Sequence, residues 1–133
     1  MLKKLTNKKG FTLMEMLIVV AIIAILVAIA IPTFSGSLAK ANAATDLANI
    51  RSGYASAQIK AMTETVANGT KLYLQKDGSV ADSGTGNYTC KGASTDVSGT
   101  NEIGGQNFTV TWAKGDTITY TISDGKVTAI AKG

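Results

Sequence analysis

The sequence of 133 residues contains no histidine, one cysteine and one proline. Without histidine, a nucleophilic serine or cysteine lacks its usual general base, and a zinc site would have to be built from carboxylates and one thiol. A single cysteine also excludes an intramolecular disulfide. The length allows one domain with a modest core. We therefore expect a protein that is not an enzyme and holds neither a metal ion nor a cofactor.

The positive charge is confined to the start of the chain. The net charge is +4, and it is carried by four lysines before Gly10, namely Lys3, Lys4, Lys8 and Lys9. Basic and acidic residues balance in the remainder. A nucleic-acid-binding domain carries its basic patch on the folded body, among exposed aromatic residues. We therefore expect no specific nucleic-acid partner.

An unbroken apolar run follows the lysines. Residues 16–31 contain no polar side chain, a pattern suited only to lipid or to a protein core on all sides. As a helix, residues 11–31 are about 30 Å long, which matches the hydrocarbon thickness of a bilayer. Lysines on one side of such a span predict that the N-terminus lies in the cytoplasm and the rest of the chain outside.

After Pro32 the pattern changes to an amphipathic helix that we expect to reach residue 68, with Gly69 as its C-cap. Apolar residues recur at spacings of three and four in two stripes. The first stripe comprises Leu47, Ile50, Tyr54, Ala57 and Ala61, and the second comprises Ala48, Ala55, Ile59, Met62 and Val66. The polar side comprises Asn42, Asp46, Asn49, Ser56, Lys60 and Glu64. Two stripes indicate either two packing partners or one broad face on a sheet, and periodicity does not choose between them.

The C-terminal half is typical of an antiparallel sheet. Its predicted strands are residues 71–75, 107–113, 117–123 and 126–131, with hairpin signals at Asp77-Gly78 and Asp124-Gly125. The polar stretch of residues 77–106 is expected on the surface. We therefore predict an α+β fold in which a long N-terminal helix, membrane-spanning in its first half, packs on three to four antiparallel strands.

Glu15 is the exception within the apolar run. A charged side chain at the centre of a membrane helix costs about 2.5 to 3.5 kcal/mol on insertion scales, which makes it a candidate for function. One interpretation is that Glu15 lies near the interface and has no specific role. The other is that cleavage between Gly10 and Phe11 creates an α-amino group, which pairs with Glu15 of a neighbouring subunit.

The junction Lys9-Gly10-Phe11-Thr12-Leu13-Met14-Glu15, with the apolar run and Pro32, resembles the type IV pilins and pseudopilins. The resemblance implies that a prepilin peptidase cuts after Gly10 and methylates Phe11, and that Glu15 supports assembly into a homopolymer. It also implies a cytoplasmic-membrane stage, an assembly platform with motor ATPases, and a fibre in which the helix can unwind before Pro32. The chain has Ala24 where many relatives carry a helix-weakening glycine.

The resemblance divides the chain into four parts: a leader (1–10), an apolar assembly helix (11–32), an amphipathic outer half of the helix (33–68) and a headgroup (69–133). The function it implies is the structural subunit of a type IV pilus, exported to the cell surface for adhesion or motility. Two alternatives stay open. One is a pseudopilin of a type II-like secretion system, and the other is an ordinary secreted protein cleaved after Ala30.

Overall fold

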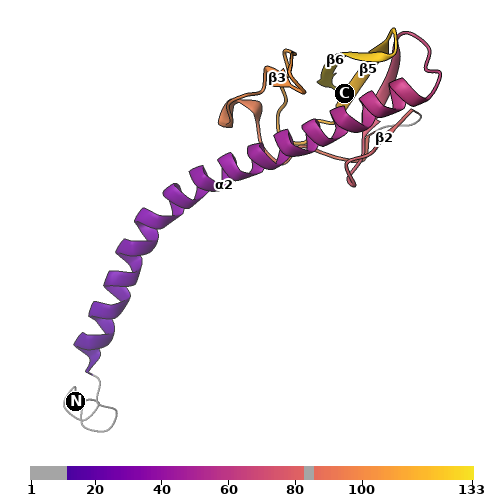
Figure 1. Cartoon of the computed structure of the whole chain (residues 1–133). Helices are drawn as coiled ribbons and strands as arrows, with labels where there is room; N and C mark the ends of the chain where they lie inside the picture. The colour runs from indigo at the N-terminus through magenta and orange to yellow at the C-terminus, as the bar shows by residue number, and fades with distance from the viewer. Residues whose placement is uncertain (1–11, 83–85) are drawn as a thin grey trace. The chain divides into compact units, whose positions relative to one another are not determined.

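The computed structural model describes residues 12–82 and 86–133, and it has an α+β fold (Figure 1). One long helix, α2, runs from Leu13 to Thr63. The strands are β1 (Thr70–Leu74), β2 (Val80–Ala81), β3 (Glu102–Ile103), β4 (Gln106–Asn107), β5 (Ile118–Ser123) and β6 (Lys126–Lys132), and a short 3-10 helix, η1, covers Ser94–Asp96. The chain divides into two units, residues 1–37 and residues 38–133.

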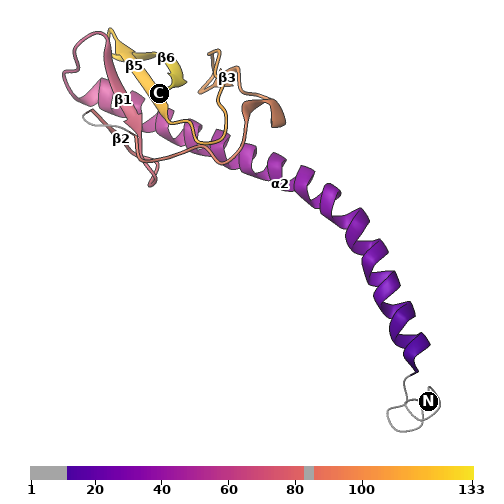
Figure 2. The ribbon, with the colours of Figure 1, turned by 180° about the vertical axis from the view of Figure 1, so that it is seen from behind.

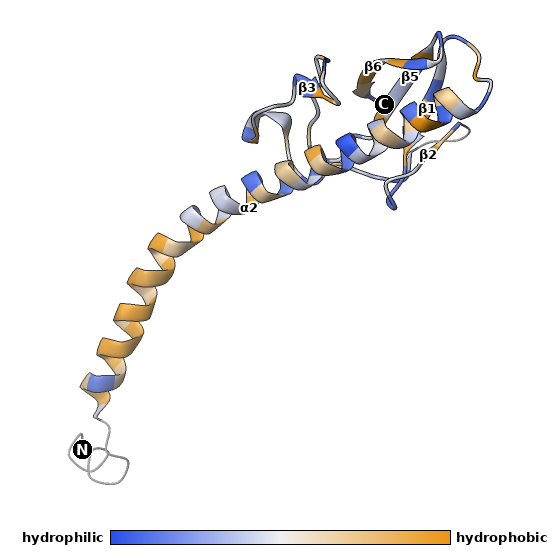
Figure 3. Cartoon of the chain, viewed as in Figure 1, coloured by the Kyte–Doolittle hydropathy of each residue, from blue (hydrophilic) through white to orange (hydrophobic). Residues whose placement is uncertain are grey.

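In the first unit, α2 is apolar around its whole circumference. Every described residue from Leu13 to Ser37 is exposed, and this part of the helix is coloured mostly hydrophobic, apart from a hydrophilic segment near its start (Figure 3). Among the described residues, α2 is the one helix long and apolar enough to cross a membrane. Its length and composition agree with the predicted span.

In the second unit, the first predicted stripe of α2 faces the protein core. Its aliphatic members are buried and Tyr54 is partly buried against the same cluster. The second stripe is not covered by the sheet, because the side chains of Ile59 and Met62 are 62% and 71% exposed. The alternative of one broad face on the sheet is therefore wrong.

The helix ends at Thr63, five residues before the predicted end. The three residues that follow, Glu64, Thr65 and Val66, include two β-branched side chains, which weaken a helix. Val66 packs against the core after the chain has left the helix. Gly69 has a positive φ of 83° and donates its N–H to the carbonyl oxygen of Ile122 at 2.7 Å. It leads into β1 and is not the C-cap.

The main sheet has four antiparallel strands in the order β2-β1-β5-β6 and lies alongside the C-terminal part of α2 (Figures 1 and 2). The β5–β6 turn consists of Asp124 and Gly125, with φ of 55° and 74°. Two positive φ values are those of the type I′ turn, which matches the twist of paired strands. The predicted hairpin at Asp77-Gly78 is also present, and it joins β1 to β2.

The predicted strand at residues 107–113 is wrong, and β2 takes its place in the sheet. Burial still alternates along the segment, because Phe108, Val110 and Trp112 are buried whereas the threonines between them are exposed. Its backbone bonds instead to the preceding loop. The Ser94 N–H donates to the Trp112 carbonyl oxygen at 3.0 Å, and the Trp112 N–H donates to Ser94 Oγ at 3.2 Å. The alternation of apolar and polar residues therefore predicted correctly which side chains are buried, but it did not predict which segment they pair with.

The polar stretch of residues 77–106 is also more than a surface loop. Three of its side chains, Tyr88, Cys90 and Ile103, are buried in the core cluster. Its last residues form the separate β3–β4 ribbon. The segment supplies apolar side chains to the core at isolated positions, which no periodicity in the sequence marks.

We predict that Gly53→Ala destabilises the headgroup. A Cβ at this helical position would lie 2.6 Å from Leu74 Cδ1 and would also meet the Tyr120 hydroxyl. Alanine favours a helix over glycine by about 1 kcal/mol, but overpacking costs about 1 to 3 kcal/mol, so we expect a net loss of stability. Urea unfolding of the full chain in non-ionic micelles, followed by Trp112 fluorescence, measures it.

Gly36→Ala is the matched control, because nothing lies within 4 Å of a Cβ at that position of the same helix. We expect it to leave the unfolding midpoint of the headgroup unchanged. A Gly53→Ala protein as stable as the wild type would contradict the close packing of α2 on Tyr120.

Candidate functional site

The start of α2 is fixed by reciprocal hydrogen bonds between Thr12 and Glu15. The Glu15 N–H donates to Thr12 Oγ1 at 3.0 Å, and the Thr12 N–H donates to Glu15 Oε2 at 3.1 Å. This arrangement is a capping box, in which a threonine N-cap and an acid three residues later satisfy two N–H groups that the helix leaves free. The carboxylate also lies in the first turn, where the helix dipole favours negative charge.

The capping box gives Glu15 a role that the sequence interpretation missed. The signal was present, because Thr12 and Glu15 have the Thr-x-x-Glu spacing immediately before an apolar run. The hydrogen bond uses Oε2, and Oε1 has no hydrogen-bond partner among the residues that the structure describes. Glu15 can therefore cap its own helix and still present one carboxylate oxygen to a cation.

The processing residues Gly10 and Phe11 lie outside the described residues, so their predicted roles stay predictions. The same holds for the leader of residues 1–10. The structure does describe Thr12 as the residue before the helix. Cleavage after Gly10 would therefore place the new α-amino group one residue before the cap.

Pro32 lies inside α2 without ending it. Proline removes one backbone hydrogen bond of a helix interior, and the resemblance implied that the helix can unwind before this residue within a fibre. The helical conformation is continuous through Pro32, so no opening is present. The next residue, Thr33, donates its hydroxyl to the Ile29 carbonyl oxygen at 3.1 Å, which adds a hydrogen bond beside the one that proline removes.

A buried carboxylate, Asp46, joins α2 to the loops of the headgroup. The sequence interpretation placed Asp46 on the polar side of the helix, and this is wrong, because the residue is 0% exposed. Its Oδ1 accepts hydrogen bonds from the Tyr88 hydroxyl at 2.6 Å and from the Lys91 N–H at 2.8 Å. Its Oδ2 accepts from the Gly92 N–H at 2.8 Å and from Trp112 Nε1 at 3.1 Å.

The four donors explain why a carboxylate is tolerated in the core. A buried charge is costly unless hydrogen bonds replace the water that it loses, and donors reach both oxygens of Asp46. The Tyr88 hydroxyl in turn accepts from Asn49 Nδ2 at 3.1 Å. Burial and the hydrogen bond to Asp46 raise the pKa of Tyr88, which keeps the hydroxyl protonated as a donor. The network holds the segment around Tyr88 against α2.

Cys90 lies in the same part of the core and is 2% exposed. Burial is the main cause that raises the pKa of its thiol to about 12, and the charges of Asp46 and Asp116 add to it. A neutral, buried thiol is unreactive. Cys90 is accordingly a free, buried cysteine, as expected of a chain with a single cysteine.

Comparison with known protein families identifies the N-terminal region. A family model described as the prokaryotic N-terminal methylation motif matches residues 5–31. This motif is the leader signature of type IV pilin and pseudopilin precursors, so the resemblance drawn from residues 9–15 is confirmed. The motif implies processing by a prepilin peptidase, membrane anchoring and assembly into pilus-like polymers, and the proteins that the motif defines are structural. No solved structure matches the chain.

We predict that Asp46→Asn destabilises the headgroup strongly. An amide keeps one acceptor oxygen, so the donors that now reach the second oxygen lose their acceptor. Each buried donor left without a partner costs about 1 to 3 kcal/mol, so we expect a loss of roughly 2 to 5 kcal/mol. Urea unfolding with Trp112 fluorescence reports the loss directly, because the indole N–H is one of the four donors.

The control is Glu64→Gln, which removes one charge from an exposed ion pair with Lys60. Exposed pairs of this kind contribute about 0 to 1 kcal/mol. If the two variants lowered the free energy of unfolding equally, the hydrogen bonds of Asp46 would not be important for the stability of the headgroup.

Proposed function

We propose that this chain, which carries the type IV pilin and pseudopilin leader, is the major structural subunit of a type IV pilus. It is made as a precursor, cut after Gly10, methylated at Phe11 and polymerised into a surface fibre for adhesion or motility. The observation that supports this best is that the matched residues 5–31 include the part of α2 whose apolar side chains are exposed on every side. Such a surface requires lipid or other apolar helices around it.

The charges at the helix start support polymerisation through α2. Cleavage after Gly10 removes all four leader lysines and creates one α-amino group at Phe11. This positively charged amine and the Glu15 carboxylate then lie in the same apolar surroundings, where burying either charge without a partner costs free energy. A stagger of about one helical turn between subunits, roughly 5 Å, brings the amine of one subunit to the carboxylate of the next. The Oε1 atom that capping leaves free is the acceptor for this pair.

The partners follow from this assembly route. Before assembly the subunit is anchored in the cytoplasmic membrane by residues 11–31, with its N-terminus inside, where a prepilin peptidase processes it. Subunits then leave the membrane through an assembly platform driven by separate motor ATPases. The headgroup faces outward in the fibre, with the segment of residues 77–106 on its surface.

The first prediction of this proposal concerns the mature N-terminus. Mass spectrometry of fibres sheared from cells should find a chain that begins with methylated Phe11. Material beginning at Ile31 would identify a secreted protein cleaved after Ala30, and an intact leader would also overturn the proposal. Long surface fibres built mainly of this chain would favour a pilus, whereas short envelope-confined ones would favour the pseudopilin alternative.

The second prediction separates the charge of Glu15 from its capping role. Glu15→Gln keeps a side-chain oxygen for the Thr12 N–H but removes the charge, which leaves the neighbouring amine unpaired. Breaking a buried ion pair in this way costs about 3 to 5 kcal/mol, so we expect fibre yield to fall by at least about ten-fold. Quantitative immunoblots of sheared fibres, normalised to membrane-bound subunit, measure the yield.

Thr12→Ala is the matched control, because it removes the capping hydroxyl and leaves the carboxylate charged. Loss of a cap costs about 1 kcal/mol of helix stability, and we expect near-normal fibres. If Thr12→Ala impaired assembly as severely as Glu15→Gln, capping and not charge pairing would be the function of Glu15.

A further inference from the structure

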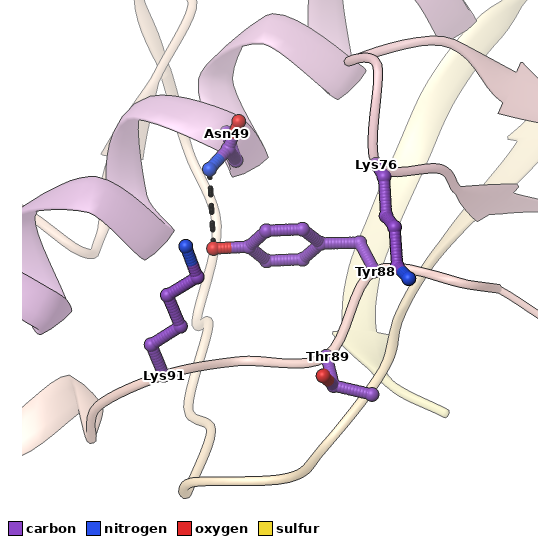
Figure 4. Close-up of a pocket in the computed structure, with 5 residues that line it drawn as sticks. All are labelled: Asn49, Lys76, Tyr88, Thr89 and Lys91. Atoms are coloured by element: carbon purple, nitrogen blue, oxygen red, sulfur yellow. Dashed lines mark hydrogen bonds between the residues drawn. The ribbon is translucent and has the colours of Figure 1, made fainter.

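A pocket in the headgroup gathers two lysines around the Asp46 network. It has a volume of about 290 Å³ and is lined by Asn49, Lys76, Tyr88, Thr89 and Lys91 (Figure 4). Its floor is the buried Tyr88, whose hydroxyl is held by Asn49 and by Asp46. In Figure 4 the Lys91 side chain extends toward the Asn49–Tyr88 pair, and the Lys76 side chain runs beside the other end of the tyrosine.

The backbone positions of both lysines are anchored. The Lys76 N–H donates to Asn87 Oδ1 at 2.6 Å, at the turn between β1 and β2. The Lys91 N–H donates to Asp46 Oδ1 at 2.8 Å. Two cationic side chains therefore emerge from fixed points on different segments into one concavity. Their ammonium groups are at the ends of long, flexible side chains.

Neither ammonium group has an acidic partner. The described residues include every acidic side chain of the chain, and their ion pairs are those of Lys60 with Glu64 and Asp82. Asp46 lies below the pocket, but four donors already satisfy its two oxygens. Asp77, next to Lys76, accepts hydrogen bonds from the N–H and the hydroxyl of Ser79 on its Oδ1 and forms no ion pair with the Lys76 ammonium group. The two ammonium groups lie at opposite ends of the Tyr88 side chain (Figure 4), so an anion bound over the tyrosine would be attracted to both.

We propose that this pocket binds a phosphate group, either the free ion or a phosphate ester of a small hydroxylated molecule. Lysine binds phosphate as a point charge, without the planar fork by which arginine matches a carboxylate. The exposed Thr89 hydroxyl also lines the pocket, where it can donate to a phosphate oxygen or accept from a ligand hydroxyl. The volume is at the lower limit of small-molecule pockets, which suits one phosphate group and not a polymer.

The test is a titration of the full, unassembled chain in non-ionic micelles, so it does not depend on polymerisation. The probes are glucose 6-phosphate, inorganic phosphate, glucose and glucuronate, and binding is followed by the NMR shifts of the Thr89 and Lys91 amides. Exposed ammonium groups bind weakly, so we expect saturation with a dissociation constant on the order of 1 mM for the phosphates. We expect no saturation with glucose and weaker binding of glucuronate.

The double variant Lys76→Gln/Lys91→Gln should weaken phosphate binding by at least about five-fold. The control, Lys71→Gln/Lys126→Gln, makes the same change of net charge at two exposed lysines outside the pocket, and it should bind like the wild type. Both pairs are exposed, so the unfolding midpoint should stay unchanged in each variant.

The titration also distinguishes the two sources of phosphate. Tighter binding of glucose 6-phosphate than of inorganic phosphate supports an ester ligand, whereas equal binding supports the free ion. Absence of saturable shifts with both phosphates, or an equal loss in the two double variants, would overturn the site. Binding of single-stranded DNA without binding of either phosphate would also overturn it, because the surface would then be a polymer-binding face.

Discussion

The exposed apolar surface of the first part of α2 is the constraint on which the rest of the molecule depends. From Leu13 to Ile31 the large side chains are about half exposed, with Glu15 as the one charged residue among them. The second unit has a core cluster of its own, made of residues from Leu47 onward. The helix must therefore be surrounded by lipid or by copies of itself, which is what a membrane-anchored subunit of a polymer requires.

Glu15 meets this constraint in two separable ways. The capping box satisfies hydrogen-bonding groups at the helix start, and this contribution would be the same in a soluble helix. Capping does not neutralise the charge, which remains costly in an apolar environment. In the proposed assembly, the amine created at Phe11 by processing supplies the counter-charge once the leader lysines have been removed. The proposed coupling of cleavage to assembly depends on that difference.

Regular patterns in the sequence predicted the elements that local rules determine. The apolar run, the buried stripe through Leu47 and Ile50, and the Asp124-Gly125 hairpin are all present, because each is specified by neighbouring residues. The prediction that residues 107–113 form a strand of the sheet was wrong, because alternating burial indicates an extended segment but does not determine which strand it pairs with. Asp46 was assigned to the polar side because its four donors come from residues 42 to 66 positions away, and spacing carries no information about them.

Asp46 shows how a headgroup with a single cysteine fixes its irregular segments. The loop that carries Tyr88 and Lys91 has little regular structure, so strand pairing does not restrain it. A disulfide would restrain such a segment by limiting the unfolded chain, whereas a buried carboxylate restrains it only while several donors converge in the folded state. The carboxylate is therefore a cooperative restraint. Loss of one donor raises the free-energy cost of burying the Asp46 carboxylate. The loop is then held less firmly against α2, and the pocket that the loop forms loses its shape.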